Sequence, residues 1–199
     1  PEDIPINDTS NWLRGIHPPL QQRIRVLERA LSFSLPHVSI CKLINDIGFL
    51  KGFHVKTFSF HLQYLNHVPL IINDRIDIAM AVDADGVHLG QSDIPAHTAR
   101  ELLGPDKIIG VSAYNKELAI EAQKEGADYL GVGDVFGTST KAGTHHVEID
   151  ILREICNAVK IPVVAIGGVN QSNVAKLADT GVSGAAVISA IIASKNITE

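Results

Sequence analysis

The stretch VPLIINDRIDIAMAVDADGVHLGQSD, residues 68–93, contains the pattern that decides the fold. Its apolar run at residues 68–74 predicts a strand, residues 76–82 predict a helix, and residues 86–89 predict a second strand. Apolar runs of this kind are typical of strands that are buried on both faces. A strand, a helix and a further strand in this order indicate a right-handed crossover between two parallel strands.

The same alternation continues along the rest of the chain. Further strands are predicted at residues 108–112, 129–135, 162–168 and 185–189, and further helices at residues 96–103, 116–125, 149–159 and 172–180. Gly104, Gly126 and Gly181 follow three of these helices, as is common at helix C-termini. Such alternation is typical of a parallel α/β sheet, either closed as a (β/α)8 barrel or open and doubly wound.

Residues 1–67 give a weaker pattern. Residues 20–33 have helical periodicity, residues 38–43 could form a strand, and residues 4–8 could form another, which Pro5 would restrict to an end or edge position. If this part supplies two more strand–helix units, the count reaches eight. We therefore predict a single (β/α)8 TIM barrel domain over residues 1–199, with irregular N-terminal strands.

The composition argues against several classes of protein. A chain of 199 residues with 45% hydrophobic residues is expected to bury one core. The net charge of -5, without a basic block, argues against a nucleic-acid partner. No apolar stretch approaches the roughly 18–20 residues that span a bilayer, so we expect a cytoplasmic protein without a membrane partner. Because the sequence begins with proline, an upstream targeting segment is left open.

Two aspartates follow neighbouring predicted strands. Asp74 ends the first strand of the opening stretch, and Asp93 lies shortly after the second. Since the carboxyl ends of parallel strands line the active site in such folds, these two carboxylates can share one Mg²⁺, which takes further ligands from water and phosphates. The alternative is that Asp74 pairs with Arg75 and that Asp93 caps the helix that begins near Pro95.

A segment rich in glycine and hydroxyl groups, GVGDVFGTSTK, lies at residues 131–141. Its glycines let the backbone approach a ligand, and Thr138, Thr140 and Lys141 carry groups that suit phosphate oxygens. The glycine spacing fits neither the dinucleotide fingerprint nor the P-loop. A polar surface loop with a solvated lysine therefore stays an alternative interpretation.

The last two predicted strands end in small residues, with AIGGV at residues 165–169 and AVISA at residues 186–190. In barrels, the loops after strands seven and eight, together with a following helix N-terminus, frequently hold a phosphate. Close packing of the glycines is the alternative explanation.

Taken together, residues 68–193 resemble the thiamine phosphate synthase family, whose members are (β/α)8 barrels. The motifs that carry the resemblance are PLIINDR (69–75), DADGVHLGQSD (83–93), IGVS (109–112), GVGDVFGTSTK (131–141), VVAIGG (163–168) and VIS (187–189). Several ordered motifs at family-like separations are far more specific than any one motif. Residues 1–67 match the family poorly.

The resemblance implies a transferase that joins 4-amino-2-methyl-5-hydroxymethylpyrimidine diphosphate to 4-methyl-5-(2-phosphoethyl)thiazole, with Mg²⁺ as the cofactor. It implies that Asp74 and Asp93 hold the magnesium ion, and that Asn73, Ser112 and Lys141 contact the pyrimidine diphosphate, the last two as catalytic residues. The residues implied for the thiazole phosphate are Thr138, Thr140, Gly168, Ile188 and Ser189. Magnesium and Lys141 would stabilise the negative charge that grows on the departing pyrophosphate.

The N-terminal part departs from the family pattern at a functional position. Family members carry a Gln-x-Arg-x-Lys element at the end of strand two, and the best counterpart here places Lys42, Ile44 and Asp46 at those three positions. Fewer cations would weaken diphosphate binding, since each charge-assisted hydrogen bond contributes roughly 1.5–3 kcal/mol. A misalignment, a frame shift in the gene and a loss of activity are all consistent with this departure.

Two alternatives to an active synthase follow. The first is a catalytically impaired paralogue that binds the thiazole phosphate as a regulatory module. The second is a related enzyme that aromatises the thiazole, although its histidine has no counterpart at Ala113 or Tyr114, which follow Ser112. The sequence leaves open whether the chain forms a homo-oligomer and whether it is part of a bifunctional protein.

Overall fold

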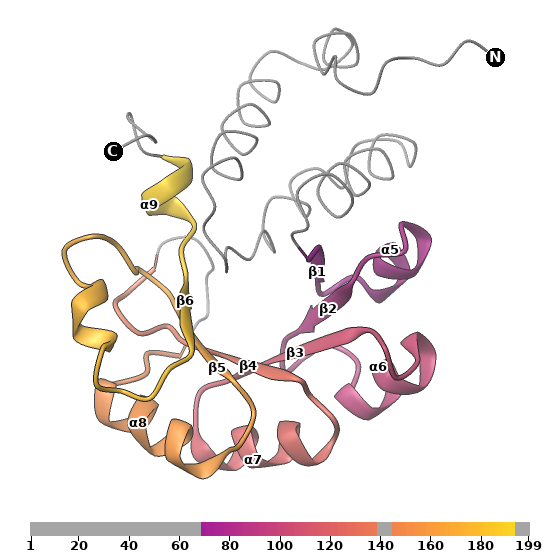
Figure 1. Cartoon of the computed structure of the whole chain (residues 1–199), viewed down its shortest axis with the longest axis horizontal. Helices are drawn as coiled ribbons and strands as arrows, with labels where there is room; N and C mark the ends of the chain where they lie inside the picture. The colour runs from indigo at the N-terminus through magenta and orange to yellow at the C-terminus, as the bar shows by residue number, and fades with distance from the viewer. Residues whose placement is uncertain (1–68, 139–144, 194–199) are drawn as a thin grey trace, which may run out of the picture.

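The structure, a computed structural model, describes residues 69–138 and 145–193 (Figure 1). These residues form a six-stranded, entirely parallel sheet with helices between the strands. The strands are β1 (Ile71–Asn73), β2 (Gly86–Leu89), β3 (Ile108–Ala113), β4 (Tyr129–Val132), β5 (Val163–Ile166) and β6 (Gly184–Ala186). The helices are α5 (Ile76–Ala81), α6 (Ala96–Leu103), α7 (Lys116–Lys124), α8 (Ile149–Ala158), the 3₁₀ helix η3 (Val174–Leu177) and α9 (Ser189–Ile192).

The order of the strands distinguishes the two architectures that the sequence left open. The strands are neighbours in chain order, β1-β2-β3-β4-β5-β6, without a reversal. A doubly wound sheet reverses its order at a switch point, whereas a barrel does not. Figure 1 shows a curled sheet with α5, α6, α7 and α8 along its outer side. The predicted parallel α/β sheet is confirmed, and the described strands form a curled half-barrel.

The two faces of the sheet differ in chemistry because side chains alternate along each strand. The outer face carries buried apolar residues that share one core with alanines and leucines of the helices; this core includes Val87, Leu89, Ile109, Leu130, Ala79, Ala99, Ala119 and Leu152. On the inner face, the register places Asn73 beside His88, His88 beside Gly110, and Gly110 beside Tyr129. Polar side chains therefore gather on the face that points away from the helices.

Aspartate side chains form hydrogen bonds with backbone groups at the amino ends of the strands. Asp85 accepts a hydrogen bond from the backbone N–H of Leu70 at 2.7 Å, and Asp128 accepts one from Ile109 at 2.7 Å. The Arg100 guanidinium also binds the Asp128 carboxylate, at 2.6 Å. These bonds satisfy backbone groups at strand starts, where the parallel ladder begins.

Two predicted elements differ from the structure. Residues 172–180 form only the short helix η3, because the Asn170 carboxamide oxygen accepts bonds from the backbone N–H and the hydroxyl of Ser172. Local bonds of this kind compete with an α-helix. The strand predicted at residues 185–189 is β6, and α9 begins at Ser189. Within the described ranges, no helix is both long and apolar enough to cross a membrane.

Candidate functional site

The predicted site residues that the structure describes lie at one edge of the sheet. They stand at or after the carboxyl ends of successive strands: Asn73 and Asp74 for β1, Asp93 for β2, Ser112 for β3, Thr138 for β4, Gly168 for β5, and Ile188 and Ser189 for β6. In a parallel sheet all these ends share one edge, so the fold gathers groups from six separate motifs. Lys42, Thr140 and Lys141 lie outside the described residues, and their roles stay predictions.

Ser112 is held from two sides. Its hydroxyl oxygen lies 3.0 Å from Nε2 of His88 on the neighbouring strand β2. Its backbone carbonyl accepts a hydrogen bond of 2.6 Å from the side-chain amide of Gln91. Asn73 is the register partner of His88, so Asn73 and Ser112 flank the same histidine on the inner face. The sequence pattern assigned no role to His88 or Gln91, since their contact with Ser112 depends on strand pairing.

The two aspartates hold their loops in defined conformations. Asp74 adopts a left-handed backbone conformation with φ of 62°, and its N–H donates to the carbonyl of His88 at 2.8 Å. The Arg75 guanidinium binds Asp77, and this hydrogen bond lowers the pKa of the Asp77 carboxyl below its usual value. The left-handed conformation, which is uncommon outside glycine, fixes the direction in which the chain leaves β1.

Asp93 closes the loop that follows β2. Its Oδ2 accepts a hydrogen bond from the N–H of Gly90 at 2.6 Å. Helix α6 has Pro95 at its N-cap position and no side-chain cap, so the interpretation of Asp93 as a helix cap is wrong. The carboxylate instead stays close to the end of β2, the strand that pairs with β1.

The residues at the ends of β1 and β2 fit a magnesium ion in their chemistry. Asp74 and Asp93 carry carboxylate oxygens and follow the carboxyl ends of β1 and β2, two strands that pair with each other. No group of three or more histidine, cysteine, aspartate or glutamate residues with metal-binding geometry occurs among residues 69–138 and 145–193. Mg²⁺ typically binds through one or two carboxylates and completes its shell with water and substrate phosphates. Two carboxylates therefore suit a magnesium ion that arrives with a diphosphate.

Asp134 organises the segment that follows β4. Its carboxylate is buried, with 7% of the residue exposed, and accepts hydrogen bonds from the N–H groups of Gly137 at 2.6 Å and Thr138 at 2.9 Å. Its backbone N–H donates to the carbonyl of His145, and its carbonyl accepts from Val147, both at 2.7 Å. The side chain of Asp134 thus holds the start of the hydroxyl-rich segment. Its backbone pairs with His145 and Val147, which follow that segment in the chain. The sequence pattern gave Asp134 no role, although an acid within an anion-binding segment needs donors of its own.

The loops after β4 and β5 pack backbone against backbone. The N–H of Val135 donates to Ile166 at 3.1 Å, and that of Phe136 donates to Gly167 at 3.0 Å. Gly168 has a φ of 63°, and a Cβ atom there would lie 2.1 Å from the carbonyl oxygen of Gly137. Only glycine fits this contact, which brings Gly168 against the segment that carries Thr138.

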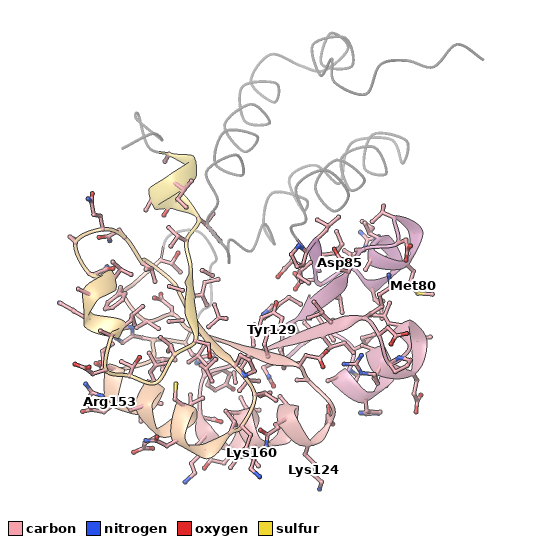
Figure 2. The ribbon with its side chains drawn as sticks, in the orientation of Figure 1. Met80, Asp85, Lys124, Tyr129, Arg153 and Lys160 are labelled. Carbon is pink, nitrogen blue, oxygen red and sulfur yellow. The ribbon has the colours of Figure 1, made fainter. Side chains whose placement is uncertain are left out.

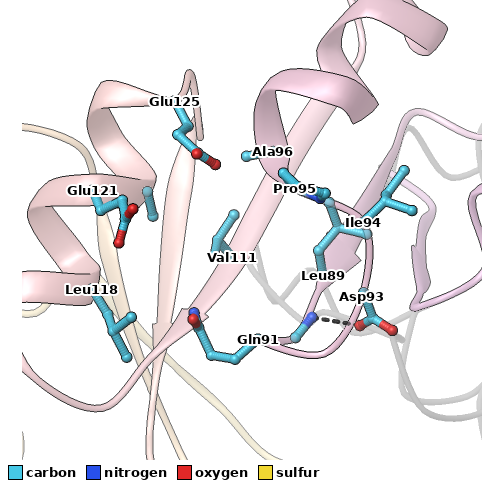
Figure 3. Close-up of a pocket in the computed structure, with 12 residues that line it drawn as sticks. Leu89, Gln91, Asp93, Ile94, Pro95, Ala96, Val111, Leu118, Glu121 and Glu125 are labelled. Carbon is cyan, nitrogen blue, oxygen red and sulfur yellow. Dashed lines mark hydrogen bonds between the residues drawn. The ribbon is translucent and has the colours of Figure 1, made fainter.

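A pocket also lies on the outer side of β2 and β3, between α6 and α7 (Figure 3). Leu89, Val111 and Leu118 form its apolar part, and Glu121 and Glu125 of α7 point into it. Gln91 and Asp93, at the carboxyl edge of the sheet, also line this pocket. Its two glutamates repel phosphate groups. The inner face at the carboxyl edge, which carries Asn73 and Ser112, is therefore the better candidate for a phosphate site.

Comparison with known proteins gives one consistent family. A family model described as thiamine monophosphate synthase matches residues 61–191. The chain is 58% identical over 132 residues to a thiamine-phosphate synthase of Clostridium acetobutylicum, covering 66% of this chain and 63% of the relative. It is 60% identical over 131 residues to one from Ruminiclostridium cellulolyticum, covering 66% and 62%. The matched part thus spans less than two thirds of the length of these curated relatives.

A solved structure gives the same result. The thiamine phosphate pyrophosphorylase from Pyrococcus furiosus superposes with a TM-score of 0.66 at 44% sequence identity. The superposition covers 73% of this chain and 69% of that chain. The two proteins are thus similar both in fold and in sequence.

Proposed function

The chain belongs to the thiamine monophosphate synthase family, and on that basis we propose that it is a thiamine phosphate synthase. The reaction is the condensation of 4-amino-2-methyl-5-hydroxymethylpyrimidine diphosphate with 4-methyl-5-(2-phosphoethyl)thiazole, giving thiamine phosphate and pyrophosphate in thiamine biosynthesis. One observation carries the proposal: the carboxyl edge of the sheet has a carboxylate-bearing half, at β1 to β3, beside a glycine- and hydroxyl-bearing half, at β4 to β6. Two phosphorylated substrates that react with each other require two such halves side by side.

The half formed by β1, β2 and β3 is proposed to bind the pyrimidine diphosphate. Asn73 and Ser112 would donate hydrogen bonds to it from the inner face, and Lys141 would add a positive charge. Asp74 and Asp93 would hold Mg²⁺, which when bound neutralises charge on the diphosphate oxygens. The flanking of His88 by Asn73 and Ser112 supports this assignment.

The half formed by β4, β5 and β6 is proposed to bind the thiazole phosphate. Thr138, Thr140, Gly168, Ile188 and Ser189 would surround the monophosphate. Because the N–H of Thr138 already donates to Asp134, a bond from Thr138 to the phosphate would come from its hydroxyl. The close packing of Gly168 on the segment after β4 supports a shared phosphate site at these two loops.

In the proposed reaction, the bond between the pyrimidine methylene carbon and the diphosphate oxygen breaks, and its electron pair leaves with pyrophosphate. The thiazole nitrogen then donates its lone pair to the resulting carbocation and forms the new carbon–nitrogen bond. No protein nucleophile is needed. The residues of the chain would orient the two substrates and stabilise the charge on the leaving group, which preorganised donors do effectively.

We also propose that the sheet closes into an eight-stranded (β/α)8 barrel in the complete protein, with its two further strands coming from residues 1–67. The unreversed strand order and the curl of the described sheet support closure. The inner face with Asn73, His88, Ser112 and Tyr129 would then line the interior of the barrel.

The test is product formation by the purified chain with both substrates and Mg²⁺. We expect thiamine phosphate to form, and we expect Asp74→Asn or Asp93→Asn to lower kcat/KM by about 100-fold or more, because the diphosphate would lose its metal ligands. The matched control is Asp150→Asn, which should keep full activity. Asp150 is an exposed residue of α8 that pairs with Arg153. Absence of product from the unaltered chain would overturn the proposal.

Lys42, Ile44 and Asp46 favour a second candidate, a regulatory module that binds thiazole phosphate without turnover. Calorimetry with each substrate alone separates the two candidates. A synthase binds both substrates in the presence of Mg²⁺, whereas the regulatory module takes up the thiazole phosphate and gives no heat with the pyrimidine diphosphate.

A further inference from the structure

His88 lies between two hydroxyl groups on the inner face of the sheet. Its Nε2 is 3.0 Å from the Ser112 hydroxyl oxygen on β3, and its Nδ1 is 3.0 Å from the Tyr129 hydroxyl oxygen on β4. The rings of His88 and Tyr129 have centroids 5.4 Å apart and are tilted by 37°. Figure 2 places Tyr129 over the middle of the sheet, whereas Lys124 and Lys160 extend away from it on the outer side. The three side chains form a hydrogen-bonded row across β2, β3 and β4.

Two glycines make room for this row. A Cβ atom at Gly110 would lie 2.2 Å from the Tyr129 ring and 2.5 Å from Nδ1 of His88. A Cβ atom at Gly131 would lie 2.8 Å from Cε1 of His88. Real Cβ contacts are longer than these distances, so any other residue at Gly110 or Gly131 would displace the rings. The backbone of β3 and β4 is therefore shaped to admit the imidazole beside Ser112.

The proposed contact of Ser112 with the diphosphate would fix the direction of each hydrogen bond in the row. Diphosphate oxygens only accept, so a serine that binds them must donate its hydroxyl proton. Ser112 Oγ must then accept from His88, which puts the proton of a neutral imidazole on Nε2. The Nδ1 atom is left as an acceptor, and the Tyr129 hydroxyl donates to it.

We propose that Tyr129 and His88 are positioning residues that hold Ser112 as a hydrogen-bond donor toward the diphosphate, an inference that rests on the proposed function. The order Tyr129 to His88 to Ser112 is set in the free protein, so the serine is oriented before substrate arrives and less freedom is lost on binding. Both residues are proposed to act on the diphosphate through Ser112.

The kinetic test uses single replacements in the full chain. Tyr129→Phe keeps the ring and removes the donor to Nδ1; we expect KM for the pyrimidine diphosphate to rise about threefold to tenfold, the effect of one hydrogen bond, with KM for the thiazole phosphate unchanged. Tyr114→Phe, which removes a hydroxyl from a tyrosine that stacks on His145, is the matched control and should change neither constant. Equal changes in both Michaelis constants for Tyr129→Phe would overturn the inference, because they would indicate a merely structural role.

A double-mutant cycle tests whether the effect passes through the serine. His88→Phe removes both hydrogen bonds of the imidazole and should raise KM for the pyrimidine diphosphate in the unaltered background. In a Ser112→Ala background the same replacement should have no further effect, because the group that it positions is gone. Full additivity of the two changes would contradict the proposed order.

Nuclear magnetic resonance of the imidazole nitrogens keeps this inference separable from the proposed function. In the free, ¹⁵N-labelled chain, His88 is assigned as the one signal pair of nine histidines that His88→Phe removes. We expect an unprotonated Nδ1 and a protonated Nε2, with a change of this pattern in Tyr129→Phe. The opposite tautomer would overturn the hydrogen-bond order even in an active enzyme, whereas an inactive chain with the expected tautomer would overturn only the function.

Discussion

At the scale of single residues, Asp134 and Gly168 explain how an acidic side chain and a glycine can belong to a phosphate site. The Asp134 carboxylate accepts hydrogen bonds from two backbone N–H groups of its own loop. Its negative charge is therefore stabilised by these donors, and the bonds hold the segment that carries Thr138 in place. Gly168 lets the next loop approach that segment to a distance that a side chain would prevent. Both residues act on the backbone around the proposed monophosphate.

Replacement of Asp134 by alanine should destabilise the protein and loosen the segment after β4. The N–H groups of Gly137 and Thr138 would lose their partner, so we expect the free energy of unfolding in urea to fall by about 2–3 kcal/mol. KM for the thiazole phosphate should rise more than KM for the pyrimidine diphosphate. Asp150→Ala on the surface of α8 should cost less than about 1 kcal/mol, and an equal loss for both variants would refute the role of Asp134.

Replacement of Gly168 by alanine can be compared with the same change at Gly104. Both glycines have positive φ, 63° and 83°, and Gly104 has a ψ of 178°, a combination that is essentially restricted to glycine, so both variants should lose about 1–3 kcal/mol from backbone strain. Only at Gly168 does the new Cβ meet another backbone, whereas nothing lies within 4 Å of it at Gly104. We expect KM for the thiazole phosphate to rise about tenfold in Gly168→Ala alone. Unchanged kinetics in Gly168→Ala would show that this loop does not bind the phosphate.

At the scale of elements, residues at the amino ends of the strands stabilise the sheet, whereas those at the carboxyl ends form the candidate site. Aspartates at the amino ends bind backbone N–H groups of neighbouring strands, as Asp85 does with Leu70 and Asp128 with Ile109. The polar residues at the carboxyl ends are the ones that we propose to contact the substrates. This division is common in parallel α/β folds, because loops at the carboxyl ends are free to vary while those at the amino ends stabilise the sheet.

Asp128→Ala should therefore change stability and leave the kinetics intact. The Ile109 N–H and the Arg100 guanidinium would each lose a partner, and we expect a loss of about 1–3 kcal/mol in urea unfolding. The Michaelis constants for both substrates, measured well below the unfolding temperature, should match those of the unaltered chain. A change in either constant at full folding would contradict the separation of the two strand ends.

At the scale of the whole molecule, β1 and β6 are the two edge strands of the described sheet. In a closed barrel, each of them would pair with a further strand. The N–H of Asp74 donates to His88 on β2, so alternation along β1 directs the N–H of Asn73 away from β2. The N–H of Ser183 likewise donates to Val163 of β5, which directs the N–H of Gly184 away from β5.

Hydrogen exchange of these outward amides tests closure of the barrel. If strands from residues 1–67 complete the proposed barrel, the amides of Asn73 and Gly184 should exchange about as slowly as those inside β3 and β4, because each would be hydrogen-bonded in a cooperative sheet. The amide of Glu117, in the first turn of α7, provides the fast-exchanging reference. Exchange of Asn73 and Gly184 at the rate of this reference would show an open sheet.

In the candidate site, sequence motifs predict the chemistry of single residues but not the contacts between residues on different strands. The chemistry of Asp74, Asp93 and Ser112 could be predicted because each follows an apolar run that ends in a recognisable motif. The contact between His88 and Ser112, 24 residues apart, and that between His88 and Tyr129, 41 residues apart, could not be predicted in the same way. Both depend on the register of paired strands, which local periodicity does not specify.

The sequence by itself determined the elements and their class. Strand β2 and helix α6 have the bounds that apolar periodicity predicts, because burial on two faces and a glycine after the last helical turn are properties of a short stretch of chain. Only the tertiary structure decided which polar groups meet on the inner face and that Asp134 binds the backbone of its own loop. The physical reason is that hydrogen bonds between strands and loops are non-local: they form once the hydrophobic face is buried and the register of the sheet is fixed.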